Sequence, residues 1–150
     1  MTDWVKQWVP DGKIWIWQYT EPDRLRNGWH FAADPAGCRS LRNLLDRMSG
    51  GGACHRKIRL AHITEAVLKM PNYGNACTGP FRNLRIEYQP EQADLNLVAG
   101  ESRLILAVGK HRLRRLASAF ERVEVGDGDF AISTSDNKRA DKWYFWWPPQ

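Results

Sequence analysis

Five aromatic residues stand next to one another in the run WYFWWPP, residues 143–149. Side chains of a β-strand alternate between its two faces, so a strand here places three rings on one face and Tyr144 and Trp146 on the other. The stretch KIWIWQY at residues 13–19 is also apolar on both sides, with Trp15 and Trp17 on one face and isoleucines on the other. Strands of this kind need cover on both faces, because so many exposed rings would favour aggregation.

Two amphipathic helices give the second strong signal. Residues 35–48 carry apolar side chains three and four positions apart, Asp34 occupies an N-cap position, and the glycines at 50–52 end the pattern. Residues 110–122 repeat this apolar spacing. Because each helix has only one apolar stripe, each is expected to cover a sheet.

The remaining pattern indicates strands and predicts an α+β fold. Strands are expected at residues 13–19, 29–33, 57–61, 83–89, 95–99, 103–108, 123–125, 129–133 and 143–147. Glycines within 126–128 predict a hairpin between the strands that flank them. Residues 63–70 fit either a strand or a short helix, and residues 24–28 and 71–80 are expected loops. The expected architecture has two layers, a mostly antiparallel sheet with both helices on one face.

The two helices also suggest an internal repeat. A shift of 72 residues lays the leucines of the first helix on apolar residues of the second, and each helix follows a strand. We therefore expect one domain over residues 1–150, with a duplicated ββαβ unit in halves 13–70 and 83–147. The alternative is coincidence, since any two amphipathic helices share this leucine spacing.

Composition narrows the class of protein without identifying a site. A chain of 150 residues is long enough to bury its own core. The net charge is +5, and fifteen of the 22 basic residues are Arg, which favours an acidic partner. No secretory signal or membrane span is expected. Three cysteines at unrelated spacings indicate free thiols and a cytoplasmic protein.

No cofactor or metal is expected, because the histidines and cysteines lack the spacing of known ligand sets. Cys38, in the first turn of a predicted helix, is the candidate nucleophile. It also lies on the apolar stripe of that helix, where a buried and inert thiol is the alternative. With no catalytic motif present, the sequence does not predict an enzyme.

The leading hypothesis is a non-enzymatic interaction module. It would bind a protein partner, or a second copy of itself as a dimer, through an aromatic-lined sheet face, because aromatic residues dominate binding hot spots. The expected anchors are Trp15, Trp17, Tyr144 and Trp146. The expected layout resembles the small two-layer α+β proteins common among bacterial immunity and accessory proteins, a likeness of fold that no particular residue carries.

The alternative hypothesis is a nucleic-acid-binding protein that uses the Arg-rich helix at 110–122. Arginines on two neighbouring helices would form a positive surface for phosphates. The expected contact residues are Arg39, Arg42, Arg112, Arg114 and Arg115.

Overall fold

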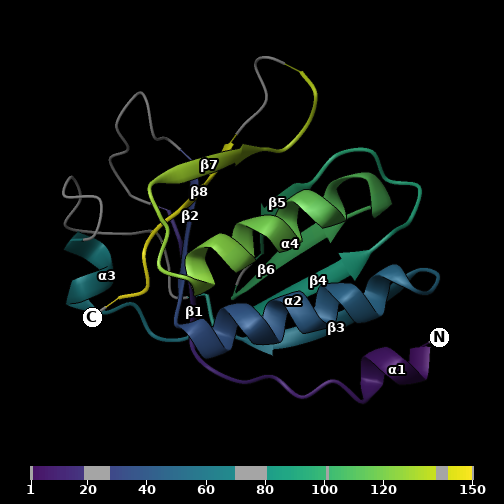
Figure 1. Ribbon diagram of the computed structural model, residues 1–150, viewed down its shortest axis with the longest axis horizontal. Helices are drawn as coiled ribbons and strands as arrows, with labels where there is room; N and C mark the ends of the chain where they lie inside the picture. Colours follow the sequence, from purple (N-terminus) through teal and green to yellow (C-terminus); the bar gives the residue numbers. More distant parts are fainter. Residues whose placement is uncertain (1, 19–27, 70–80, 101, 138–141, 150) are drawn as a thin grey trace.

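The computed structural model describes residues 2–18, 28–69, 81–100, 102–137 and 142–149. In these ranges the chain forms four helices and eight strands (Figure 1), and the predicted α+β class is confirmed. The helices are α1 (Thr2–Lys6), α2 (Pro35–Ser49), α3 (Glu65–Lys69) and α4 (Lys110–Glu124). The strands are β1 (Ile14–Trp17), β2 (Trp29–Ala33), β3 (Cys54–Arg59), β4 (Asn83–Tyr88), β5 (Asn96–Ala99), β6 (Arg103–Val108), β7 (Phe130–Ser133) and β8 (Lys142–Phe145).

The strands form two four-stranded sheets instead of the single sheet expected. The first sheet has the order β1-β2-β8-β7, and the second has the order β3-β4-β6-β5. In each sheet the two central strands are parallel and each outer strand is antiparallel to its neighbour. Backbone hydrogen bonds link the sheets at both sides: Ala61 N–H donates to the Ile14 carbonyl at 2.9 Å, and Leu95 N–H donates to the Thr134 carbonyl at 2.8 Å.

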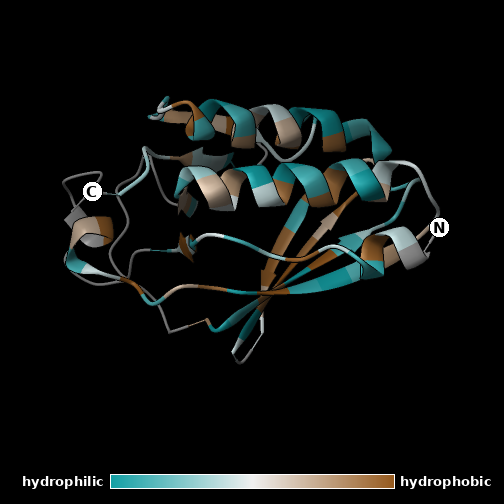
Figure 2. Cartoon of the chain, turned by 60° about the horizontal axis from the view of Figure 1, so that its bottom comes forward, coloured by the Kyte–Doolittle hydropathy of each residue, from teal (hydrophilic) through white to brown (hydrophobic). Residues whose placement is uncertain are grey.

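The long helices explain why two sheets form. Helix α2 leads from β2 in the first sheet to β3 in the second, and α4 leads back from β6 to β7. The predicted cap of α2 is confirmed, since Asp34 Oδ1 accepts from Gly37 N–H at 2.7 Å and from Lys13 N–H at 3.0 Å. Helices α2 and α4 pack side by side along one side of the strands (Figures 1 and 2). Their apolar stripes face inward.

One main core lies between the helices and the two sheets. Phe31 of β2 is at its centre, 5.1 Å from the Phe120 ring of α4 and 5.0 Å from the Phe145 ring of β8. Other fully buried members come from both helices and both sheets: Leu41, Leu44, Leu84, Ile86, Leu106 and Leu116. The core therefore joins both halves of the chain into one packed unit.

Several local predictions change. The expected strand at 123–125 is wrong, because Val123 is buried on the α4 stripe and the helix continues to Glu124. Gly126, with a φ of 93°, follows the end of this helix and does not form a hairpin turn. The ambiguous segment 63–70 contains helix α3. The expected loops at 24–28 and 71–80 lie outside the described residues, apart from Gly28.

The strands and long helices follow the same order in two halves of the chain when these are divided between β4 and β5, which puts β4 in the first half and not in the second as expected. Without the short helices α1 and α3 of the first half, each half reads ββαββ, and each sheet takes two strands from each half. Both long helices have 15 residues and begin 75 residues apart, at Pro35 and Lys110, so the helical shift is 75 and not 72. A duplication of one unit stays a prediction, whereas the shared order of strands and long helices is observed.

Candidate binding surfaces

The predicted aromatic anchors lie in an interior cluster. Trp17 is 1% exposed, Trp146 3% and Trp15 7%, while Tyr144 is half-buried against them. The segment that follows β3 covers this side of the first sheet with Ala61, Ile63 and Val67. The expectation of an open aromatic face is therefore wrong, because the chain supplies its own cover. We call the side of the first sheet that carries Trp15, Trp17, His30, Tyr144 and Trp146 the aromatic face.

Ring stacking and hydrogen bonds order the aromatic face. Trp17, His30 and Tyr144 are neighbours in the strand register, and the His30 ring stacks on both, with centroids 5.7 and 5.3 Å away. His30 Nδ1 accepts from the Trp146 indole N–H at 2.9 Å. The Trp15 indole N–H donates to the His62 carbonyl at 2.9 Å, which ties the covering segment to the sheet. These contacts are those of a packed interior.

The N-terminal segment covers a different part of the molecule. Trp8 is buried and its indole N–H donates to the Ser40 carbonyl at 2.9 Å. Trp4 is half-exposed, with the Arg47 guanidinium 4.2 Å from its ring centre. Helix α1 therefore packs on α2 and β3, away from the aromatic face.

Arg112 does not belong to an exposed basic surface, contrary to the nucleic-acid hypothesis. Its side chain is 4% exposed, and Nη2 donates to Asp136 Oδ1 at 2.6 Å. The register of α4 turns Arg112 toward the β7 end of the first sheet, where Nη1 also reaches the Ser133 carbonyl at 3.4 Å. Arg114 and Arg115 are exposed on the same helix.

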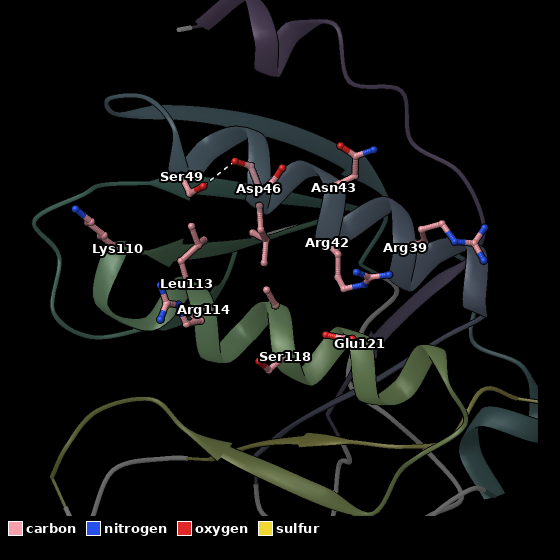
Figure 3. A pocket seen from close by; sticks show the side chains of 12 residues that line it. Arg39, Arg42, Asn43, Asp46, Ser49, Lys110, Leu113, Arg114, Ser118 and Glu121 are labelled. Atoms are coloured by element: carbon pink, nitrogen blue, oxygen red, sulfur yellow. Dashed lines mark hydrogen bonds between the residues drawn. The ribbon is translucent and has the colours of Figure 1, made fainter.

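A groove of about 900 Å³ runs between α2 and α4 (Figure 3). At one end Arg42 donates from Nε and Nη2 to Glu124 Oε1, at 2.9 and 2.6 Å, and Arg39 Nε lies 3.4 Å from the other oxygen of that carboxylate. Two of the predicted nucleic-acid contacts therefore already have an intramolecular anionic partner.

The other end of the groove repeats this mixture of charges. Figure 3 shows Lys110 and Arg114 on α4 across from Asp46 on α2. Under the 75-residue shift Arg39 corresponds to Arg114, and Asp46 corresponds to Glu121. Each end thus holds both signs of charge. Four basic and two acidic side chains line the groove, and Glu124 pairs with two of the cations, so a small positive excess remains.

The second sheet has an outer side of a different kind. Its inward residues, such as Leu84, Ile86 and Leu106, are buried, whereas the alternate residues face away from the core. These outward residues include five basic side chains, His55, Lys57, Arg59, Arg85 and Arg103. We call this side, with the two apolar residues described next, the basic face.

The register places the charges of the basic face around an apolar centre. Lys57 pairs with Arg85, which pairs with Ile105, and Ile105 pairs with Val98. Val98 is 57% exposed. Glu87 is the acidic residue of this face among those described, and its Oε1 accepts from Arg85 Nε at 2.8 Å. The basic face therefore combines an uncompensated positive charge with an exposed apolar patch.

The thiol of Cys38, the candidate nucleophile, is buried. Burial raises the pKa of the Cys38 thiol to about 12, and the nearby carboxylates of Glu124 and Asp34 act in the same direction. This thiol stays protonated at neutral pH and is a poor nucleophile. Cys77 lies outside the described residues.

In the part of the chain that the structure describes, no group of three His, Cys, Asp or Glu side chains could hold a metal ion. In the same residues, no helix has the length and apolar character needed to span a bilayer.

Comparisons with known proteins add no family. No protein-family model matches the chain, and neither the curated proteins nor the solved structures gave a match. The interpretation of function therefore depends on the surfaces themselves.

The basic face was not predicted as a site, although the sequence holds a signal for it. In CHRKIR, residues 54–59, His55, Lys57 and Arg59 alternate with residues of the other face. Period-two alternation of cations in a strand marks one face of a sheet as charged.

Proposed function

We propose that the protein is a cytoplasmic, non-enzymatic interaction module that binds an acidic protein partner through the basic face. The observation that carries this proposal is the set of four exposed basic residues, His55, Lys57, Arg59 and Arg103, on one side of the second sheet. The acidic residue described on this side, Glu87, is already paired with half-buried Arg85. Complementary charge steers association and selects partners. The free, buried thiol of Cys38 suits a reducing compartment.

The apolar centre favours a protein over a nucleic acid as the partner. Ile105 and exposed Val98 offer an apolar contact of the kind found at the centre of protein interfaces, with charges around it. A phosphate backbone has no group that would cover these side chains. The described residues of this face also include no Phe, Tyr or Trp ring on which an unpaired base could stack, and His55 is its one aromatic side chain.

Positive charge also argues against self-association through this face. A second copy would bring Lys57, Arg59 and Arg103 against the same cations. Like charges in direct opposition disfavour such an interface. The partner is therefore a different protein, with carboxylates placed around an apolar residue.

The test begins with a photo-crosslinking residue at Ile105, and with the same residue at Ser118 in the α2–α4 groove as a control. A protein crosslinked from Ile105 but not from Ser118 is identified and purified. Its affinity is then measured for the wild type and for a variant with Lys57, Arg59 and Arg103 changed to Glu. We expect this triple reversal to weaken binding at least about 30-fold, mainly through slower association.

A matched control variant changes Lys110, Arg114 and Arg115 to Glu, three exposed cations of α4. It has the same net charge as the first variant. A partner that binds the basic face should therefore bind this control with wild-type affinity and bind the first variant more weakly. Equal weakening by both variants, or none by the first, contradicts the proposal. Titration with single-stranded RNA and duplex DNA at two salt concentrations tests the other class: micromolar binding that is salt-dependent and lost in the first variant would identify a polyanion site instead.

A further inference from the structure

Strand β3 forms an open edge of the second sheet, since β4 is the one strand that pairs with it among the described residues. In an antiparallel pair, the backbone groups of successive residues point alternately toward the partner strand and away from it. Two hydrogen bonds show which residues point away. Leu60 N–H donates to the Arg82 carbonyl at 2.8 Å, on the β4 side of β3. Gln89 N–H donates to the Val108 carbonyl at 3.0 Å, so Gln89 faces β6 and Tyr88, one residue earlier, faces β3.

The backbone groups of His55, Lys57 and Arg59 therefore point to the open edge. Because Leu60 N–H faces β4, every second residue before it faces β4 as well, and the residues between them face outward. The orientation of Tyr88 gives the same result, since the register pairs it with the first residue of β3. In the described part of the chain, none of these outward N–H and C=O groups has a hydrogen-bond partner.

The same three residues carry basic side chains on the basic face. An extended segment that pairs with this edge would place every second side chain beside them and its other side chains on the inner side. On the inner side the Arg56 guanidinium holds the Lys6 and Trp8 carbonyls, at 3.1 and 2.9 Å. A recess of about 560 Å³ lies between α1 and the first residues of β3, so the edge has free space beside it.

We propose that the acidic partner binds with an extended segment that adds to β3 as a further strand of the second sheet. Backbone hydrogen bonds with His55, Lys57 and Arg59 hold the segment, and carboxylates at every second position contact the basic face. A second copy of β3 is a poor occupant, because pairing of two such edges brings cations against cations. This inference rests on the proposed function, since it names the part of the same partner that contacts β3.

Nuclear magnetic resonance of the backbone amides tests the proposal on the intact protein, with the synthetic peptide acetyl-ETEVETE-amide as the probe. We expect saturable binding at sub-millimolar to millimolar peptide concentrations. Bound peptide should slow amide hydrogen exchange at the outward N–H groups of His55, Lys57 and Arg59. The N–H groups of Arg56 and Ile58, which face β4, should change less.

Two methylated peptides separate strand addition from attraction between charges. In one the glutamates carry N-methyl groups, and in the other the intervening residues carry them, so both peptides keep every carboxylate. The N–H groups of alternate residues point to opposite edges of a strand, so one of the two peptides should bind at least about 10-fold more weakly and the other should bind normally. Equal affinities of the two, or no saturable binding of the unmethylated peptide at about 5 mM, overturn the proposal.

Lys57→Gln and Lys57→Pro supply a matched pair of variants, because both remove the same charge. Proline also removes the outward N–H, at an edge position where strands tolerate it. We expect peptide affinity to fall about 3-fold in Lys57→Gln and at least about 10-fold in Lys57→Pro, with circular dichroism as the check on folding. Equal losses in two folded variants overturn the proposal, and the methylated peptides decide the question if Lys57→Pro does not fold.

Strand addition and the proposed function fail in different ways. The acidic protein crosslinked from Ile105 should also protect the outward amides of His55, Lys57 and Arg59 from exchange. If charge reversal weakens its binding but these amides stay unprotected in the complex, the proposed function stands and strand addition is wrong.

Discussion

One row of paired residues crosses the outer side of each sheet at the same topological position. In the first sheet the row contains Trp17, His30, Tyr144 and Ala131. In the second sheet the equivalent row contains Val98, Ile105, Arg85 and Lys57. The hydrogen-bonding frame is the same in both, with a parallel central pair and antiparallel outer strands. The outward side chains differ completely.

This difference determines what covers each face. The rings of the first row would be costly to leave in water, and the segment after β3 buries them with Ile63 and Val67. The second row offers cations that remain solvated and needs no cover from its own chain. Equivalent strand positions can therefore be buried or exposed, and the outward side chains, not the backbone, determine which.

The difference between the two rows is tested most strongly by shortening one side chain at the same position in each row. Trp17 and Val98 are equivalent in register, but Trp17 is buried and Val98 is exposed. Trp17→Ala should lower the free energy of unfolding by about 3–5 kcal/mol, because it leaves a cavity beneath the covering segment. Val98→Ala should change it by less than about 0.5 kcal/mol.

Urea denaturation followed by circular dichroism measures both variants under one set of conditions. A loss below about 1 kcal/mol for Trp17→Ala would show that the aromatic face is not interior in solution. It would also return Trp17 to the set of residues available to a partner.

A smaller effect tests how the cover is attached. Trp15 corresponds to Asn96 in the second sheet, and only Trp15 is buried. Trp15→Phe keeps an aromatic ring but removes the N–H that donates to the His62 carbonyl, so stability should fall by about 1 kcal/mol. Amide hydrogen exchange at residues 63–67 should quicken, which Asn96→Ala should not cause. Unchanged exchange would mean that packing alone holds the segment.

The sequence was informative where local chemistry decides the structure. The Asp34 cap and the apolar stripes predict both long helices, because capping and helical periodicity involve residues close together in the chain. Two sheets could not be predicted in the same way. The pairing of β2 with β8 joins residues more than 100 positions apart, such as Phe31 and Phe145, and no short pattern encodes it.

The candidate sites were harder to predict for the same reason. The cover over the aromatic face comes from Ala61, Ile63 and Val67, whose modest apolar pattern fits several structures. The burial of Arg112 depends on Asp136, which comes near only after α4 has returned the chain to the first sheet. The alternating cations of β3 are visible in the sequence, but their exposure depends on how the rest of the chain packs around the second sheet.

The smallest predicted effect concerns the charge of the basic face in the free protein. Lys57 and Arg85 are directly opposite each other on neighbouring strands, and like charges in such pairs are destabilising, although the Glu87 carboxylate that pairs with Arg85 reduces the repulsion. Lys57→Gln should therefore raise the free energy of unfolding by about 0.3–0.5 kcal/mol at low salt, and the gain should vanish near 0.5 M salt as screening increases. The control Lys57→Arg keeps the charge, so its free energy of unfolding should differ little from that of the wild type at either salt concentration.

The measurement is urea denaturation at two ionic strengths. A destabilising effect of Lys57→Gln would mean that Lys57 supports the fold. The predicted gain would mean instead that a repulsive pair stands on the open face at a small cost in stability, as expected if its use lies in binding an acidic partner.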